Sequence, residues 1–195
     1  MRMSHLVLAL AGTLMCTGCS ELISLHPFVT DKEAALDARL LGVWTDADDV
    51  YIVRQDGKGY AISFSDQKSS AVYKLKAAML KVGDATILDL TPADEDAFQV
   101  AAHTPLRVWV EGWTVRMAYL DSKWLKEHAS AELAVDKAGD RLLITAPQEA
   151  VTRFLLTYGA DDRAFGKITV LTRQQYRERP RAPPVWRAAT ATWRR

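Results

Sequence analysis

From Gly42 onward, apolar and polar residues alternate with a period of two, which is typical of β-strands that bury one face. The alternation is clearest in residues 60–65, 73–77 and 106–111, and Asp56-Gly57 is a hairpin signal between two such segments. The apolar positions are Tyr60, Ile62, Phe64, Tyr73, Leu75, Ala77, Leu106, Val108 and Val110, and the polar face of the last segment carries Arg107, Trp109 and Glu111. The pattern predicts a series of antiparallel strands.

Two later segments have helical spacing instead. Asp121 is a suitable N-cap for a short helix, and Thr145 and Gln148 have capping-box spacing at the start of a second helix, which Gly159 ends. The apolar sides of these helices are Trp124, Leu125 and His128, and Val151, Phe154, Leu155 and Tyr158. A short helical turn is also predicted within residues 31–41, ahead of the first strand.

The order of these elements predicts a mainly β fold. About eight to ten short strands with hairpin spacing, followed by short helices toward the C-terminus, favour an antiparallel meander that closes into a barrel or a strongly curled sheet. We expect this domain to span residues 42–173, after a tether at residues 19–41 that lies along the domain. A packed interior and a ligand cavity use the same residue types, so the pattern leaves both open.

The N-terminus carries an export signal. Residues 6–15 form an apolar run of about ten residues, too short for a membrane span, which needs roughly 20. The run ends in Leu14-Met15-Cys16-Thr17-Gly18-Cys19, which resembles the lipobox of bacterial lipoproteins. The resemblance implies that residues 1–18 are a signal peptide and that Cys19 is acylated, so that membrane lipid is the first partner. Ser20 after the cysteine favours the outer membrane, on its periplasmic side; an ordinary secretion signal with a chance cysteine is the alternative.

Charge and cysteine content narrow the function classes further. Six arginines and one glutamate give residues 174–195 a charge of +5, and Arg2 adds +1, so the rest of the chain carries −5 when the whole chain is +1. An acidic body argues against nucleic-acid binding. The tail is rich in Arg and Pro and is predicted to be disordered. Both cysteines, Cys16 and Cys19, lie in the signal region, so the domain contains no disulfide.

Gly42-Val43-Trp44 at the start of the first strand resembles the Gly-x-Trp signature of lipocalins and other calycins. In that family the tryptophan plugs the closed end of a β-barrel and an arginine late in the chain packs over its ring. By order along the chain the resemblance assigns this arginine to Arg173. The chain as a whole also resembles small uncharacterised bacterial lipoproteins with Leu-His-Pro and Leu-Leu-Gly-x-Trp elements, a likeness that supplies no activity.

No residue pattern predicts catalysis or metal binding. His26, His103 and His128 are the histidines of the body, and none stands in a nucleophile elbow or in a cluster with zinc-ligand spacing. The acidic runs at residues 46–49 and 94–96 lack the glycine and the distal glutamate of a calcium loop and are interpreted as solvated turns. We therefore predict no catalytic residue, no metal and no cofactor; a hydrolase or isomerase is an alternative without a motif.

Two functional hypotheses follow. In the first, the barrel binds a small apolar or amphipathic ligand, with Tyr60, Phe64 and Tyr73 lining a cavity and Trp109 and Trp113 lining its mouth. In the second, the chain is a non-catalytic structural or interaction subunit of an envelope protein assembly. It would then contact its protein partner through the same two tryptophans or through the arginine-rich tail.

Overall fold

The computed structural model describes residues 22–30, 32–66, 68, 70–94, 101–128, 133–139 and 141–175. The signal peptide, Cys19 and tail residues 176–195 lie outside the described residues, so the predictions made for them stay predictions.

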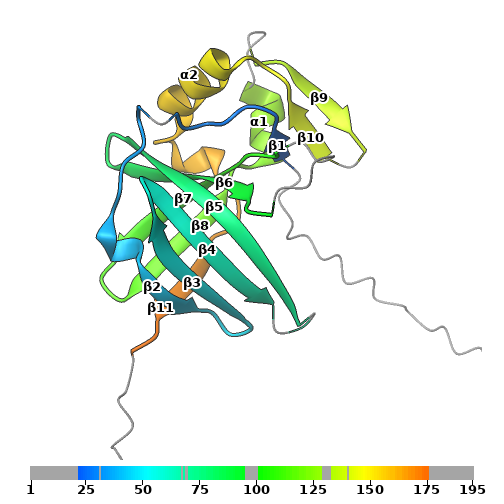
Figure 1. Cartoon of the computed structure of the whole chain (residues 1–195). Coiled ribbons are helices and arrows are strands. Elements are labelled where there is room, and N and C mark those ends of the chain that lie inside the picture. The colour runs from blue at the N-terminus through cyan, green and yellow to red at the C-terminus, as the bar shows by residue number, and fades with distance from the viewer. Residues whose placement is uncertain are drawn as a thin grey trace, which may run out of the picture.

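Eight strands of the described chain close into an antiparallel barrel with the order β11-β2-β3-β4-β5-β6-β7-β8 (Figure 1). Their bounds are β2 (Gly42–Thr45), β3 (Asp49–Asp56), β4 (Gly59–Asp66), β5 (Ala71–Val82), β6 (Ala85–Pro92), β7 (Thr104–Glu111), β8 (Thr114–Tyr119) and β11 (Thr169–Arg173). The prediction of a mainly β meander closed into a barrel, with short helices toward the C-terminus, is confirmed.

A second layer lies over one side of the barrel (Figure 1). A small sheet with the order β1-β10-β9 belongs to this layer, together with two α-helices. The bounds are β1 (Leu22–Ser24), β9 (Val135–Ala138), β10 (Arg141–Ile144), α1 (Ser122–His128) and α2 (Gln148–Tyr158), and two short 3-10 helices are η1 (Ala38–Leu40) and η2 (Asp162–Ala164). The predicted turn ahead of the first strand corresponds to η1, which leads directly into β2.

Strands β5 to β8 contribute to two separate cores because their side chains alternate between the two faces of the barrel wall. On β5, Met79 belongs to the cluster inside the barrel and Leu80 to the cluster outside it. On β6, Leu88 lies inside and Ile87 lies outside, so residues 85–90 are all buried. The outer cluster is completed by side chains from β1, α1, β10 and α2, among them Leu22, Leu125, Ile144 and Leu155.

The segment between β1 and η1 is held against the barrel by a buried carboxylate. Asp89 is 3% exposed and accepts hydrogen bonds from the backbone N–H of Phe28 at 2.8 Å and of Val29 at 3.4 Å. His103 Nδ1 lies 3.1 Å from the same carboxylate oxygen. Ser24 and His103 also exchange two backbone hydrogen bonds. The expectation that the tether lies along the domain is confirmed for its described part.

The two α-helices begin in different ways. Asp121 caps α1 as predicted, because its Oδ1 accepts a hydrogen bond from the Trp124 N–H at 2.7 Å. The capping box predicted for α2 is wrong. Gln148 instead donates to the Pro27 carbonyl oxygen at 2.6 Å, and the Thr145 hydroxyl donates to Asp136 at 3.0 Å. Both side chains therefore bond residues outside the helix start, and the spacing of Thr145 and Gln148 in the sequence does not reveal these partners.

No helix of the described residues combines the length and apolar character needed to cross a membrane.

Replacing Asp89 with Ala is expected to destabilise the fold. The change leaves two buried backbone donors without their acceptor, which costs about 3 kcal/mol in all. Urea unfolding followed by circular dichroism measures this loss. The control is Asp94→Ala, whose side chain is 82% exposed and lies 3.9 Å from Lys74, so its unfolding free energy should stay within about 0.5 kcal/mol of the wild type. Equal effects of the two changes would contradict the role given to Asp89.

Candidate functional site

The interior of the barrel is hollow. It encloses a cavity of about 690 Å³, within the range of about 300–1,000 Å³ typical of small-molecule sites. Every barrel strand contributes to its wall, and so does Leu40 of η1. The apolar lining residues are Leu40, Trp44, Val53, Ile62, Phe64, Leu75, Leu88, Leu90, Leu106, Val108, Val115, Met117 and Leu171. The sequence was compatible with either a packed interior or a ligand cavity, and the structure contains a cavity.

Strand register orders the wall of β3 and β4 from one end of the cavity to the other. Val53 pairs with Ile62, Tyr51 pairs with Phe64, and Asp49 pairs with Asp66, and all six side chains line the cavity. Because alternate residues of a strand face the same side, these pairs are successive steps along one inner surface. The wall therefore changes from aliphatic to aromatic to acidic toward the end where β4 finishes, which we call the mouth.

An aromatic row crosses three neighbouring strands below the acidic pair. Phe64 lies directly opposite both Tyr51 and Tyr73, and its ring stacks on theirs with centroid distances of 4.8 and 5.6 Å. Burial, and next the nearby Asp49 carboxylate, raise the pKa of the Tyr51 hydroxyl. Tyr51 is therefore neutral at ordinary pH, and it lines the cavity with its ring stacked on Phe64.

The mouth is acidic. Asp46, in the β2–β3 turn, lines it together with Asp49 and Asp66. Asp46 Oδ1 accepts the backbone N–H groups of Asp48 at 2.9 Å and of Asp49 at 2.8 Å, which fixes its position in the turn. Lys68 also lines the mouth, and its ammonium lies 2.7 Å from the carboxylate of Asp48.

Trp44 closes the other end of the barrel. Its ring is 1% exposed, and its Nε1–H donates to the Leu40 carbonyl oxygen at 2.8 Å. The guanidinium carbon of Arg173 lies 4.3 Å from the ring centroid, and Arg173 donates a hydrogen bond to the Arg39 carbonyl oxygen. The contact that the Gly-x-Trp resemblance implied is therefore present.

Gly42 is required beside this contact for two reasons. Its φ of +133° is a conformation that other residues rarely adopt, and a Cβ atom there would lie 3.2 Å from Arg173 Nη1. The strand therefore begins with a residue whose missing side chain makes room for the guanidinium group.

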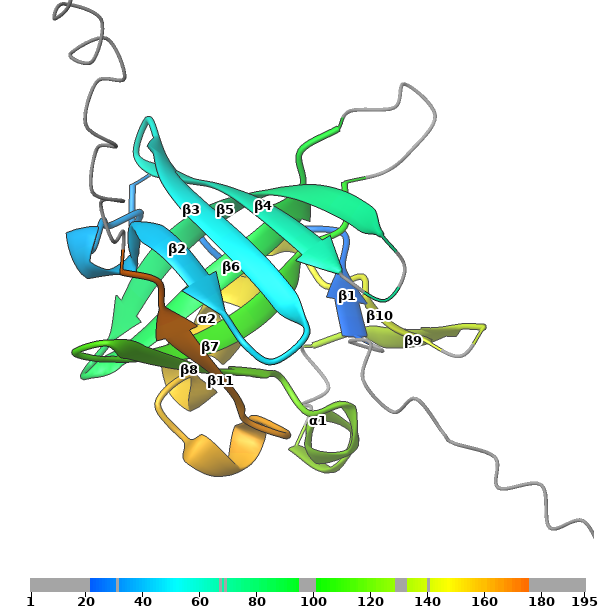
Figure 2. The same ribbon diagram turned by 90° about the horizontal axis from the view of Figure 1, so that it is seen from below.

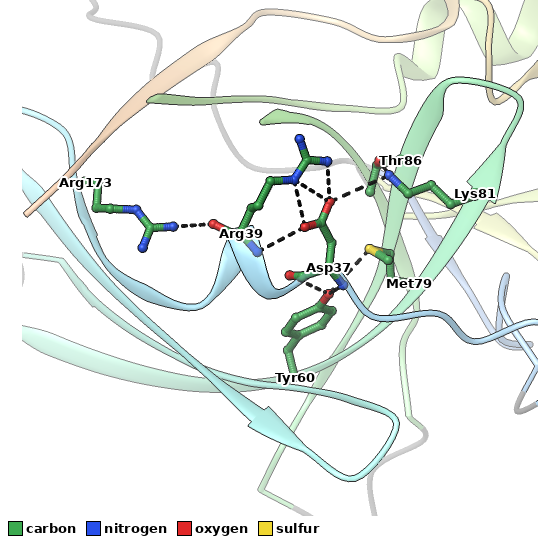
Figure 3. Close-up of polar contacts among 7 residues, drawn as sticks. All are labelled: Asp37, Arg39, Tyr60, Met79, Lys81, Thr86 and Arg173. Atoms are coloured by element: carbon green, nitrogen blue, oxygen red, sulfur yellow. Dashed lines mark hydrogen bonds and ion pairs between the residues drawn. The ribbon is translucent and has the colours of Figure 1, made fainter. Parts of the chain in front are cut away.

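Tyr60 fixes η1 onto the floor of the cavity (Figure 3). Its hydroxyl oxygen accepts the Asp37 N–H at 2.7 Å, and the hydroxyl lies 3.3 Å from the Asp37 carbonyl oxygen as a donor. Hydrogen bonds from Arg39, at 2.6 Å for Nη2, hold the pKa of the Asp37 carboxyl below its usual range. Lys81 Nζ lies 3.9 Å from the same carboxylate and also bonds Thr86.

The predicted ligand-lining residues divide into two groups. Tyr60, Phe64 and Tyr73 lie in the cavity wall, whereas the placement of Trp109 and Trp113 at its mouth is wrong. Trp109 packs against the outer core between Arg107 and Arg116, whose guanidinium carbons lie 4.8 and 5.2 Å from its ring. Trp113 is 59% exposed in the β7–β8 turn, and its carbonyl accepts the Arg173 N–H at the closed end. The odd positions of β7 face outward, as their alternation indicated.

Sequence analysis missed the polar part of the cavity. Asp46 and Asp49 were interpreted as members of a solvated turn, and Tyr51, Asp66 and Tyr119 were not singled out, although all five line the cavity. The sequence did indicate the position of Asp66, because it is the next alternate residue after Ile62 and Phe64 and therefore faces the same side of β4.

Two of the three body histidines, His103 and His128, pack against other side chains, whereas His26 is exposed. His103 joins Asp89 beneath the N-terminal segment, and His128 stacks on Trp124 with ring centroids 4.1 Å apart. Among the described residues, no three His, Cys, Asp or Glu side chains gather closely enough to hold a metal ion.

Comparisons of the chain with protein-family models, with curated proteins and with solved structures found no match.

A double-mutant cycle tests the contact between Arg173 and Trp44. The unfolding free energies of Arg173→Ala, Trp44→Leu and the double variant should give a coupling energy of about 1 kcal/mol, since the guanidinium has a ring to contact only when both residues are present. Arg116→Ala, combined with the same Trp44 change, is the control. Its guanidinium contacts Trp109 on the outer face, so these two effects should add. A coupling near zero for Arg173 would show that the contact contributes nothing to stability.

Proposed function

We propose that the chain is a lipid-anchored envelope lipoprotein that binds a small apolar or amphipathic molecule inside its barrel. The cavity of about 690 Å³ with its apolar floor carries the proposal. Burial of apolar ligand surface contributes about 25 cal/mol per Å², so an aliphatic chain seated among these side chains gains affinity from most of its length. The proposal assigns no catalytic step to the chain.

The position of β1 supports a role next to a membrane. β1 begins three residues after Cys19, a distance of at most about 11 Å along an extended chain. Ser24 bridges His103, which directly precedes β7, and β7 runs from the mouth to the closed end. Both views show β1 toward the end of the barrel where β4 finishes, whereas β11 ends on the opposite side (Figures 1 and 2). An acyl group on Cys19 would therefore hold the mouth near the bilayer, where an apolar ligand is concentrated.

Filling the cavity should abolish binding. In the full chain carrying Cys19→Ala, so that no acyl group is present, the additional change Val53→Trp places a large ring in the hollow interior. We expect at least tenfold weaker binding of the neutral fluorescent probe N-phenyl-1-naphthylamine, measured by titration. Val170→Trp is the matched control, because Val170 is 51% exposed and does not line the cavity.

Circular dichroism and cooperative urea unfolding establish that both tryptophan variants are folded. Leu75→Phe, at another lining position, replaces Val53→Trp if the larger ring prevents folding. Equal probe affinity in the filled and control variants would place the probe outside the barrel and overturn the proposal.

The anchor is tested separately through the two cysteines. Cys19→Ala should move the protein from the membrane fraction to the soluble fraction and abolish incorporation of radiolabelled palmitate, because stable anchoring requires the acyl chains. Cys16→Ala removes the neighbouring thiol and should leave both readouts unchanged. Palmitate incorporation that persists in the Cys19 variant would exclude Cys19 as the lipidated residue.

A further inference from the structure

The charged side chains that line the cavity are confined to its mouth and are mostly acidic. Among the described lining residues they are Asp46, Asp49, Asp66 and Lys68, so carboxylates exceed ammonium groups by two. The ammonium of Lys68 lies 2.7 Å from Asp48, a carboxylate beside the cavity, so its charge is shared with an anion outside the lining. The mouth therefore carries a negative field directed at whatever occupies the cavity.

Two of these carboxylates stand directly opposite each other. Asp49 and Asp66 pair across β3 and β4 and face the same interior. A cation bound between the two strands is attracted by both carboxylates, whereas an anionic group there is repelled by them.

A row of stacked aromatic rings lies one inward-facing step below the carboxylates. Tyr51 and Phe64 are the next inward-facing pair on the same two strands, and Tyr73 extends the stack onto β5. An ammonium or quaternary ammonium group at the mouth is attracted by the carboxylates, and its carbon substituents can lie against the apolar ring stack. A carboxylate or phosphate head group is repelled by the carboxylates.

The depth of the cavity suits a long chain. From Tyr60 at the floor to Asp66 at the mouth, β4 rises six residues, or about 20 Å at roughly 3.3 Å per residue. A strand tilt of about 40° reduces this to a depth of about 15 Å along the barrel axis. An extended alkyl chain of about dodecyl length reaches from Trp44 at the closed end to the acidic pair.

We propose that the cavity selects amphiphiles that carry a cationic nitrogen head, such as long-chain amines or alkyl quaternary ammonium compounds. The alkyl chain occupies the apolar floor, and the head lies against Asp49 and Asp66 above the Tyr51–Phe64–Tyr73 row. This inference rests on the proposed function, because it names the class of ligand for the same cavity.

Three amphiphiles with one chain length test the inference. Dodecyltrimethylammonium and dodecanoate, each below its critical micelle concentration, and dodecanol, below its solubility limit, are titrated by calorimetry into the full chain carrying Cys19→Ala at low ionic strength. We expect the cationic compound to bind at least tenfold more tightly than dodecanoate, with dodecanol between them. The difference should shrink as salt screens the charges at the mouth.

The double change Asp49→Asn and Asp66→Asn removes two charges at the mouth without changing side-chain size. We expect the affinity ratio of dodecyltrimethylammonium to dodecanol to fall about tenfold. The matched control, Asp56→Asn with Asp84→Asn, removes two exposed charges from turns at the other end of the strands and should leave the ratio unchanged. Urea unfolding checks that both double variants fold.

The outcomes separate the two proposals. Binding of dodecanol and the naphthylamine probe without a preference for the cationic compound, or a ratio unchanged in the mouth variant, overturns the head-group inference and leaves the binding function standing. Failure of all the amphiphiles and of the naphthylamine probe to bind overturns the binding function and the inference with it. If the mouth variant does not fold, Asp66→Asn alone is compared with Asp56→Asn, and the same ratio decides.

Discussion

Closure of the barrel between its first and last strands is the constraint on which the structure depends. β11 pairs with β2 over only two residue pairs, Thr172 with Thr45 and Arg173 with Trp44, and with β8 on its other side. Such a short seam gains little from backbone hydrogen bonds alone. The Trp44 ring, its hydrogen bond to the chain ahead of β2 and the guanidinium above it strengthen the seam, so the residues that seal one end of the cavity also complete the barrel wall.

The cavity is compatible with a stable fold because the second core lies outside the barrel. The outer faces of β5 and β6 bury Leu80 and Ile87 against α2 and the N-terminal segment, and Asp89 ties that segment down. Stability therefore does not require the interior to be filled. In a barrel whose outer surface faces only water, the interior is the single core, and a void of this size would leave many apolar side chains without packing partners.

The sequence predicted the strand pattern, the barrel and the direction of most side chains, because a period of two is a local property. The placement of Tyr60, Phe64 and Tyr73 in the cavity wall followed from it. Trp109 was misplaced because it lies on the outer face of the barrel wall, which the alternation of β7 already indicated. The error with Trp113 arose because hairpin position does not reveal which end of a barrel a turn closes. That depends on the pairing of β11 with β8, between residues far apart in the chain. The acidic mouth was missed for a related reason: Asp49 and Asp66 become one feature only through the register of β3 against β4.

The position of β11 as the last strand of the described residues also affects how the protein folds. Each of β3 to β8 pairs with its neighbour in sequence, so this part of the sheet assembles from local contacts, whereas closure joins residues 169–173 to residues 42–45. Contacts between segments so far apart form slowly because they require a long loop to close. Until β11 arrives, β2 and β8 are open sheet edges with unpaired backbone groups, the kind of surface on which chains aggregate. Correct folding therefore requires that this last strand becomes available before the open edges meet those of another molecule.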